Sequence, residues 1–323
     1  MDRIPLVSVF CPTYNHEKYI RQCLEGFVMQ QTNFQIEVIV QDDASTDGTS
    51  KIVKEFAEKY SFIIPRIHEV NIYSQGKDLN EYFYNNARGK YIAMCEGDDY
   101  WTNPLKLQKQ VDFLEANEEY GMVYTRAKVF NQKKQTFLKR INGEEYINYE
   151  GLLQKNTIPT LTSLFRRDIL IGYYKAVGDN LYKWKIGDYP LWLYISKVKN
   201  IHFISNVTGT YRLNEESASQ TKSHTKKLEY LESIFNVQEY FSLLHCVDKI
   251  VYNKITNNYF RRAIYSAIIT KNNYLVSKIK SYMKTQKLYF SFIIVILIQL
   301  INTDSLINQF CAKILNMLWK RKI

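Results

Sequence analysis

Residues 89–99 read GKYIAMCEGDD, an apolar run that ends in three carboxylates. The apolar part is typical of a buried strand. The carboxylates are Glu96, Asp98 and Asp99, and at neutral pH they repel one another unless a cation, a cationic ligand or a raised pKa relieves them. Hard oxygen ligands at this density suit Mg²⁺ or Mn²⁺, although an isolated acidic pair after a strand more often caps the next helix.

A second strand-like run ends in the same way. Residues 36–40 (IEVIV) lead into the acidic turn DDASTDG at residues 42–48, and residues 6–10 form a further β-rich run. Apolar residues at helical spacing follow these runs, which predicts an α/β fold with a mostly parallel sheet. Ligands bind at the carboxyl ends of the strands in such sheets, and we expect both acidic clusters there.

Capping signals predict where two helices begin. Asn15 is expected to cap a first helix with Glu17 in its first turn, and Asn103-Pro104 is expected to open another as N-cap and first helical residue. Further along the chain the pattern predicts strands at residues 121–130 and 202–211 and helices within residues 226–287.

The net charge of +11 is unevenly distributed. Residues 1–120 carry 12 basic and 19 acidic side chains, whereas residues 121–323 carry 31 basic and 13 acidic ones. A uniformly basic nucleic-acid binder would not have so acidic a first half, and no recognisable nucleic-acid module is present. We therefore expect no nucleic acid as partner. A basic nucleic-acid-binding protein stays an alternative because the aromatic residues would supply stacking platforms.

The cysteines and the amino terminus indicate a reducing compartment. Five cysteines are scattered without a C-x-x-C pair, which argues against a disulfide framework and a zinc site. The first residues lack the basic-then-apolar order of a signal peptide, so export by that route is not expected.

Three segments in order closely resemble the amino-terminal half of the family 2 glycosyltransferases. They are VSVFCPTYN at residues 7–15, VIVQDDASTDGT at residues 38–49 and GKYIAMCEGDD at residues 89–99. The resemblance covers residues 5 to about 220 and implies a GT-A (Rossmann-like) nucleotide-sugar-binding sheet, followed by a helical, basic C-terminal extension. It implies a transferase that uses a nucleotide-diphospho-sugar donor, with UDP as the expected nucleotide.

The resemblance also implies a division into domains. A glycosyltransferase domain is expected at residues 1–225, with its nucleotide-binding half at residues 1–120 and its acceptor half at residues 121–225. A helical C-terminal region is expected at residues 226–323.

The family's donor-binding residues are carried over where this chain matches its motifs. Tyr14 would lie against the base, and Asp43 would accept a hydrogen bond from it. Glu96 stands in place of the first aspartate of the family's D-x-D motif, on an arm one methylene longer, so its direct ligation of a metal is not expected. The implied nucleotide-binding residues are Pro12, Thr13, Tyr14, Asp43, Glu96 and Asp98, and Asp98 and Asp99 would share the metal and ribose contacts, with Mn²⁺ or Mg²⁺ as cofactor.

GDYPLW at residues 187–192 resembles the family's E-D-x-x-L-W region, whose aspartate is the catalytic base. Asp188 holds that position here, and Gly187 replaces the acid before it. The alternative from the residues alone is that Asp188 caps a helix ahead of Pro190, and both roles can hold at once.

GTYRLNEESAS at residues 209–219 resembles the loop that closes over the diphosphate. The implied residues of this loop are Tyr211, Arg212 and Asn214, and Asn214 replaces a histidine that is frequent in relatives. An amide can bond a phosphate but is a poor metal ligand. Arg212 would neutralise phosphate charge, or else it belongs to salt-bridged scaffolding.

These groups together imply an inverting transfer. A divalent cation on Asp98 or Asp99 would offset charge on the leaving nucleoside diphosphate, and Asp188 would take the proton of the acceptor hydroxyl. One base without an evident nucleophile implies a single displacement, with a glycan or a lipid-linked molecule as acceptor. The alternatives are a sugar-1-phosphate nucleotidyltransferase, whose usual Gly-rich loop is missing after the first strand, and a catalytically inactive glycosyltransferase-like scaffold.

The carboxyl-terminal part contains two membrane-prone segments. Residues 288–301 are apolar over 14 positions, fewer than the roughly 20 that a spanning helix needs, and residues 305–323 are amphipathic and basic. The apolar run is expected either as a buried helix or, within residues 288–323, as a peripheral membrane contact. A bacterial surface glycan is the expected setting, in the cytoplasm at the inner face of the cell membrane.

Overall fold

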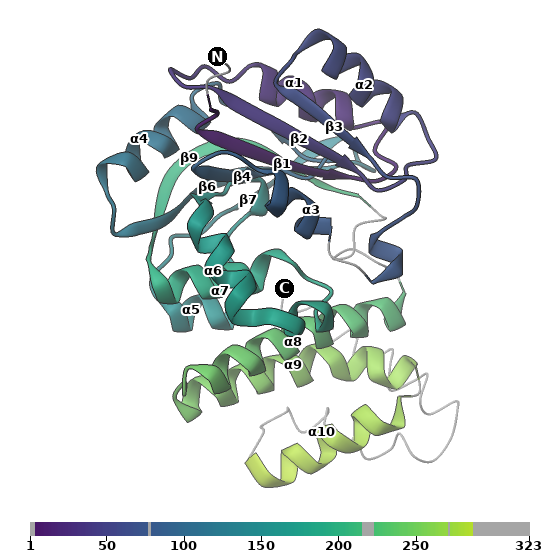
Figure 1. Cartoon of the computed structure of the whole chain (residues 1–323). Helices are drawn as coiled ribbons and strands as arrows, with labels where there is room; N and C mark the ends of the chain where they lie inside the picture. Colours follow the sequence, from purple (N-terminus) through teal and green to yellow (C-terminus); the bar gives the residue numbers. More distant parts are fainter. Residues whose placement is uncertain (1–3, 77–78, 215–222, 271, 287–323) are drawn as a thin grey trace. The chain divides into compact units, whose positions relative to one another are not determined.

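The computed structural model describes residues 4–76, 79–214, 223–270 and 272–286 (Figure 1). The segments at residues 288–301 and 305–323 lie outside the described residues. The chain divides into two compact units, one of residues 1–183 and 187–214, the other of residues 184–186 and 215–323.

The elements of the larger unit alternate as expected for an α/β fold. Its strands are β1 (Val7–Thr13), β2 (Ile36–Asp42), β3 (Ile63–Ile67), β4 (Tyr91–Met94), β5 (Tyr100–Trp101), β6 (Tyr120–Asn131), β7 (Thr136–Asn142), β8 (Leu164–Arg166) and β9 (Asn200–Leu213). Its α-helices are α1 (Ile20–Val28), α2 (Thr49–Lys59), α3 (Leu79–Asn86), α4 (Lys106–Ala116), α5 (Tyr149–Gln154), α6 (Arg167–Val177) and α7 (Asp188–Val198), with 3₁₀ turns at Tyr73–Gln75, Thr160–Thr162 and Gly178–Lys183.

The described strands form one nine-stranded sheet in the order β3-β2-β1-β4-β8-β6-β9-β5, with β7 paired to β6. β1 runs parallel to β2 and β4, and β2 runs parallel to β3, so these four strands end at the same edge. β8 pairs antiparallel with both β4 and β6. The predicted α/β class is confirmed, and the parallel part of the sheet carries both acidic clusters at its carboxyl edge.

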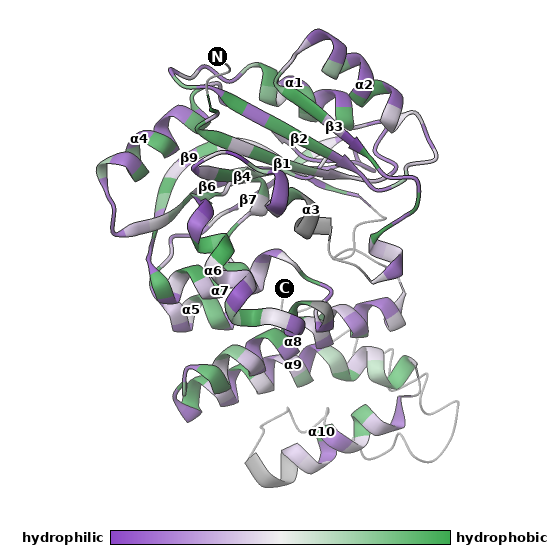
Figure 2. Ribbon diagram, viewed as in Figure 1, coloured by the Kyte–Doolittle hydropathy of each residue, from purple (hydrophilic) through white to green (hydrophobic). Residues whose placement is uncertain are grey.

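Side-chain alternation along β1 buries both faces of the sheet. Val7, Val9 and Cys11 belong to the core that includes residues of α1, α2 and α4. On the opposite face Phe10 stacks on Phe83 of α3, with ring centroids 4.4 Å apart. Strands covered on both faces have apolar middles, and Figure 2 shows this for β1 and β2, although β2 also carries hydrophilic residues, among them Glu37 and the pair Gln41-Asp42 at its end.

Both predicted helix starts are wrong. α1 begins at Ile20, and Asn15 does not cap it: the Asn15 side-chain oxygen accepts a hydrogen bond from the backbone N–H of Thr46 at 2.8 Å. α4 begins at Lys106, after Asn103-Pro104 rather than at it. In both places the short polar side chain bonds loop backbone, an alternative that competes with capping.

The smaller unit is helical, with α8 (His224–Leu244), α9 (Lys249–Ile269) and α10 (Asn273–Gln286) in its described part. Aromatic contacts join these helices. Phe235 of α8 stacks on Tyr259 of α9 at a centroid distance of 4.3 Å, and Phe260 of α9 contacts Tyr282 of α10 at 4.9 Å. None of the described helices in either unit combines the length and the apolar character needed to cross a bilayer.

Lys106 is a cation buried in the core of the larger unit, with 1% of the residue exposed. Its Nζ donates to Gln110 Oε1 at 2.9 Å and lies 4.1 Å from the centroid of the Trp101 ring. Among the described residues no carboxylate lies within ion-pair distance of it. Burial therefore lowers the pKa of Lys106 to about 7.

We expect Lys106→Met to change how stability depends on pH. Between pH 7 and 10.5 unfolded Lys106 holds a proton that folded Lys106 lacks, so this residue makes the free energy of unfolding rise with pH. The rise is at most about 1.4 kcal/mol per pH unit. The stability advantage of Lys106→Met over the wild type should therefore shrink with pH across this range and stay constant below it.

Denaturant titrations at several pH values measure this difference, with Lys109→Met on the exposed side of the same helix as control. A difference that is independent of pH would contradict the lowered pKa of Lys106.

Candidate active site

The loops that follow β1, β2 and β4 are bonded to one another at the carboxyl edge of the sheet. The backbone N–H of Asp43 donates to Thr13 O, and that of Gly97 donates to Pro12 O, both at 3.0 Å. A Cβ at Gly97 would lie 2.6 Å from Thr13 Oγ1, so only glycine lets the loop after β4 approach β1 this closely. The three motif segments therefore form one continuous surface.

The segment after β1 presents an aromatic ring to solvent. Tyr14 is 45% exposed, whereas Thr13 before it is buried and its Oγ1 lies 3.1 Å from His16 Nδ1. The backbone N–H of Asn15 donates to Ser45 Oγ at 2.8 Å, which joins this segment to the acidic turn after β2. The contact of His16 with Thr13 was not predicted, because a histidine three positions from a threonine carries no distinctive sequence signal.

Both carboxylates at the end of β2 accept hydrogen bonds from neighbouring groups of the protein. Asp43 is buried, and its oxygens accept from the backbone N–H groups of Ile72 at 2.6 Å and Tyr73 at 3.1 Å. Asp42 accepts from the backbone N–H of Ser45 at 3.0 Å and from its hydroxyl at 2.5 Å. Contact between Asp43 and the nucleotide base stays a prediction. A base bound there would share the Asp43 carboxylate with the backbone N–H groups of Ile72 and Tyr73.

Carboxylates from distant parts of the chain meet beyond β4. Glu96 and Asp98 follow that strand, whereas Asp188 begins α7. Burial raises the pKa of Glu96 to about 8, and the negative charges of Asp188 and Asp98 add to the shift. The predicted base thus lies within electrostatic reach of the acidic loop.

Asp188 is held by two hydrogen-bond donors. Thr160 Oγ1 donates to Asp188 Oδ2 at 2.5 Å, and the backbone N–H of Tyr189 donates to Oδ1 at 2.7 Å. Burial raises the pKa of Asp188, and both hydrogen bonds oppose the rise. The N-cap of α7 is Gly187, so the alternative of Asp188 as the cap ahead of Pro190 is wrong.

The adjacent aspartates of the acidic loop differ in their surroundings. Asp99 is buried and accepts from the backbone N–H of Arg212 at 2.7 Å. Burial raises the pKa of Asp99, the charges of Asp98 and Glu96 raise it further, and Arg212 opposes the shift. Asp98 is half-buried, and its Oδ2 accepts from the Asn214 amide at 3.0 Å. The end of β9 therefore binds both carboxylates.

The Arg212 guanidinium is enclosed by neutral groups. It donates to Gln132 Oε1 at 3.0 Å and to Gln22 Oε1, and its central carbon lies 4.7 Å from the centroid of the Tyr100 ring. Within the described residues it forms no salt bridge, so salt-bridged scaffolding is not its role here. Tyr211 beside it is half-buried against the core. The contacts of both residues with a diphosphate stay predictions.

The acidic loop fits a divalent cation only in part. In the described part of the chain no three His, Cys, Asp or Glu side chains converge as ligands for a metal. Mg²⁺ commonly takes one or two carboxylates, with substrate phosphates and water completing its shell. Asp98 suits this because its Oδ1 accepts no hydrogen bond from the described residues, whereas buried Asp99 is already bonded to Arg212.

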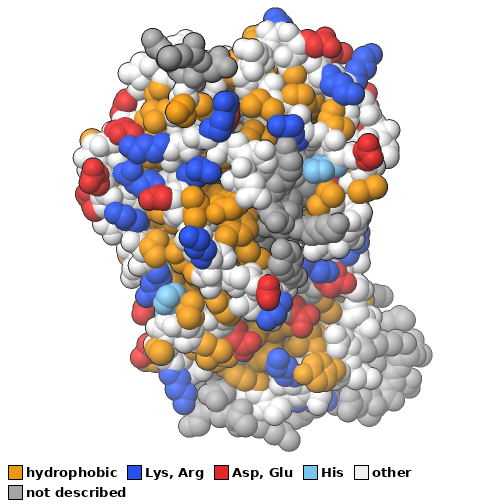
Figure 3. Space-filling model, in the orientation of Figure 1, with side chains coloured by type: hydrophobic (Ala, Val, Ile, Leu, Met, Phe, Trp, Pro, Cys, Tyr) orange, Lys and Arg blue, Asp and Glu red, His pale blue; other side chains and the backbone are white. Residues whose placement is uncertain are grey.

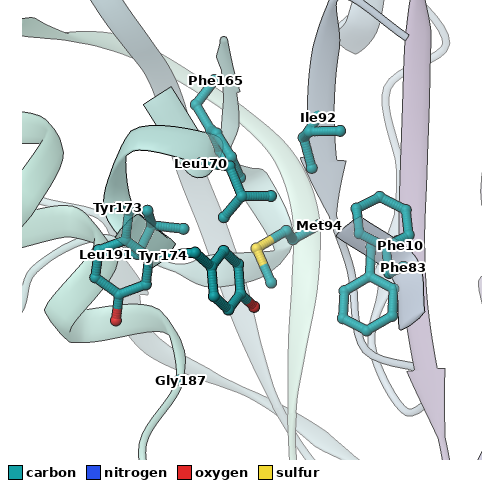
Figure 4. Close-up of a pocket in the computed structure, with 10 residues that line it drawn as sticks. All are labelled: Phe10, Phe83, Ile92, Met94, Phe165, Leu170, Tyr173, Tyr174, Gly187 and Leu191. Carbon is teal, nitrogen blue, oxygen red and sulfur yellow. The ribbon is translucent and has the colours of Figure 1, made fainter. Parts of the chain in front are cut away.

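An apolar pocket adjoins the carboxylates (Figure 4). It measures about 340 Å³ including its open mouth. Met94 lies two positions before Glu96 and Gly187 lies one position before Asp188, but none of the carboxylates themselves lines the pocket. Its lining residues are Phe10, Phe83, Ile92, Met94, Phe165, Leu170, Tyr173, Tyr174, Gly187 and Leu191.

Similarity to known proteins agrees with this geometry. An uncharacterized protein of Mycobacterium tuberculosis is 38% identical over 166 residues, which are 50% of this chain and 47% of that protein. The Escherichia coli protein WfgD, named a UDP-Glc:alpha-D-GlcNAc-diphosphoundecaprenol beta-1,3-glucosyltransferase, is 28% identical over 229 residues, 70% of this chain and 84% of its own. This chain spans about half the length of its mycobacterial relatives.

The fold likeness extends further than the sequence likeness. The crystal structure of Staphylococcus aureus TarS 1-349 in complex with UDP-GlcNAc superposes with a TM-score of 0.61 at 16% identity, covering 98% of this chain and 92% of that one. The predicted GT-A fold is confirmed. The family model described as glycosyl transferase family 2 matches residues 8–173, half of the chain and all of the strands that carry the three motifs, and the chain therefore belongs to glycosyl transferase family 2.

Proposed function

We propose that this chain transfers a sugar from a nucleotide-diphospho-sugar, with UDP as the nucleotide, to a hydroxyl of a glycan or lipid-linked acceptor. The observation that carries the proposal is that Asp188, held by Thr160 and the Tyr189 N–H, lies within electrostatic reach of Glu96 in the acidic loop, which supports a general base close to the proposed site of the leaving group. The UDP-GlcNAc bound to TarS and the donor and acceptor in the name of WfgD support this choice of substrates. The proposed location is the cytoplasmic face of the membrane.

Asp188 is the proposed general base. As the acceptor oxygen attacks the anomeric carbon, Asp188 takes the hydroxyl proton, and the bond from that carbon to the diphosphate oxygen breaks with its electron pair on the nucleoside diphosphate. Hydrogen bonds from the Thr160 hydroxyl and the Tyr189 N–H hold the Asp188 carboxylate in position before the proton is transferred. A single displacement without a nucleophile of the protein inverts the anomeric carbon.

We assign donor binding to the same edge of the sheet. The exposed Tyr14 ring would lie against the base, and Asp98 would hold a divalent cation together with the diphosphate. A bound cation would offset the charge that develops on the leaving group. Asp99 is instead assigned to positioning, since it joins the acidic loop to β9.

We expect Asp188→Asn to lower the transfer rate by about 10²-fold or more, because the amide cannot accept the hydroxyl proton. Donor binding, measured by calorimetry, should stay within a few-fold of the wild type. Asp168→Asn is a matched control: Asp168 also lies in the first turn of a helix and also accepts from the next backbone N–H, at 2.9 Å. Transfer at near wild-type rate in Asp188→Asn would exclude Asp188 as the base. Donor binding by the wild type without transfer to any acceptor would instead favour the inactive scaffold.

We expect Thr160→Val to shift the acidic limb of the pH–rate profile to higher pH. The Thr160 hydroxyl stabilises the charged form of Asp188, so its removal raises the pKa of the base. The base must be deprotonated to act, and activity should then fall off at a higher pH than in the wild type. A profile that is lower throughout but unshifted would mean that Thr160 serves only folding.

We expect chelation to lower transfer strongly, with recovery on adding Mn²⁺ or Mg²⁺. In Asp98→Asn the same addition should restore little activity and should no longer tighten UDP binding, because the proposed protein ligand is lost. Titration of UDP with and without Mn²⁺ measures the second effect apart from catalysis. UDP binding that Mn²⁺ tightens equally in both proteins would contradict the role of Asp98.

A further inference from the structure

The hairpin of β6 and β7 carries charge of one sign. Residues 126–142, called the basic hairpin below, contain six Lys and Arg residues and no Asp or Glu. On the face drawn in Figure 3, by contrast, basic side chains lie among acidic ones. Within the described residues, no carboxylate lies within ion-pair distance of Lys128, Lys139 or Arg140. These charges are not compensated by the fold.

Large apolar side chains lie exposed among these cations. Phe137 is 53% exposed and Ile141 is 49% exposed. Ile141 lies opposite Lys128 in the register of the hairpin, and the Lys128 Nζ is 5.6 Å from the centroid of the Phe137 ring. β7 pairs only with β6 among the described strands, so its other edge has no neighbour there. Because side chains alternate along β7, Lys139 shares one exposed face with Phe137 and Ile141, as does Lys128 opposite Ile141, whereas Arg140 lies on the other face.

The basic hairpin is attached to the strand end that holds the acidic loop. β6 pairs with β9 up to Asn131 and Leu213, and the backbone N–H of Gln132 donates to Leu213 O at 3.2 Å. The next residue, Asn214, bonds Asp98. A surface bound by the basic hairpin would therefore lie next to the active site.

We propose that the basic hairpin docks on the surface of an anionic bilayer, with its cations on lipid phosphates and with Phe137 and Ile141 in the headgroup region. A soluble polyanion would need only the cations, whereas exposed Phe and Ile between Lys and Arg suit a charged surface with an apolar layer beneath it. This surface is independent of residues 288–323, and the proposal does not rest on the proposed transfer reaction.

The test uses the full chain with an environment-sensitive fluorophore on a single engineered cysteine. In a Cys246→Ser, Cys311→Ser background the fluorophore is attached at Ile141→Cys, or at Glu58→Cys on the exposed side of α2 as control. Phosphatidylcholine vesicles with phosphatidylglycerol should shift the emission of the Ile141 probe to shorter wavelength, and vesicles of phosphatidylcholine alone should not. Emission at Ile141 that does not change, or changes as it does at Glu58, overturns the proposal.

Charge variants test the cations without moving the probe. Replacing three cations of the basic hairpin by serine should weaken vesicle binding by about tenfold or more, while the same loss of charge on α2 should have a much smaller effect. The variants are Lys128→Ser with Lys139→Ser and Arg140→Ser, against Lys51→Ser with Lys54→Ser and Lys59→Ser. If both triple variants weaken vesicle binding equally, the net charge of the protein alone determines binding, and the proposal is overturned.

Phe137→Ser with Ile141→Ser distinguishes a membrane from a soluble polyanion. This variant should lose vesicle binding severalfold. If instead it binds vesicles like the wild type while dextran sulfate binds tightly and loses affinity only in the charge triple, the hairpin is a polyanion site and the membrane proposal fails. Transfer to a water-soluble acceptor should be unchanged in all of these variants, which separates the outcome from that of the proposed function.

Discussion

The central constraint on this protein is electrostatic. The fold buries several carboxylates near the carboxyl edge of the sheet, where both desolvation and repulsion between them disfavour their charged forms. Glu96, Asp99 and Asp188 all have raised pKa values, and desolvation is the leading cause for each. The fold compensates with donors that carry no charge: a backbone N–H of β9 on Asp99, and a hydroxyl and a backbone N–H on Asp188. Donors of this kind lower the cost of burying the carboxylates without removing their charge, as the proposed binding of a divalent cation would require.

The sequence predicted the elements that carry strong local signals. Runs such as residues 36–40 and 90–95 are apolar on both faces because helices cover both sides of the parallel strands, and this made the strands and their acidic ends recognisable. The short strands β3 and β5 were not predicted. β5 has two residues, Tyr100 and Trp101, and exists because they pair with Thr210 and Gly209 more than a hundred positions later. Helix starts were wrong where Asn15 and Asn103 bond loop backbone instead of capping.

Within the site, too, residues with a local sequence signal were predicted, and those that depend on contacts between distant segments were not. Motif spacing identified Asp98 and Asp188 as candidates, but it carried no information on Thr160, whose contact with Asp188 depends on how a 3₁₀ turn packs against the start of α7. Nor did it separate Asp98 from Asp99. Both residues lie in the turn between β4 and β5, and only the position of β9, whose Arg212 N–H bonds Asp99, determines that Asp99 is the buried one. Arg212 likewise matched a motif, yet its guanidinium is surrounded by glutamine and aromatic side chains.

The bond between Asn214 and Asp98 has a consequence for cation binding at this edge. A metal ion on Oδ1 of Asp98 would draw negative charge away from the carboxylate whose Oδ2 accepts from the Asn214 amide, and would weaken that hydrogen bond. The hydrogen bond between the end of β9 and the acidic loop would therefore respond to a cation bound at Asp98. A histidine at this position could bind the metal directly, whereas the Asn214 amide would act on it only through Asp98. Binding of a cation at Asp98 and the strength of the contact between the acidic loop and β9 would then be coupled.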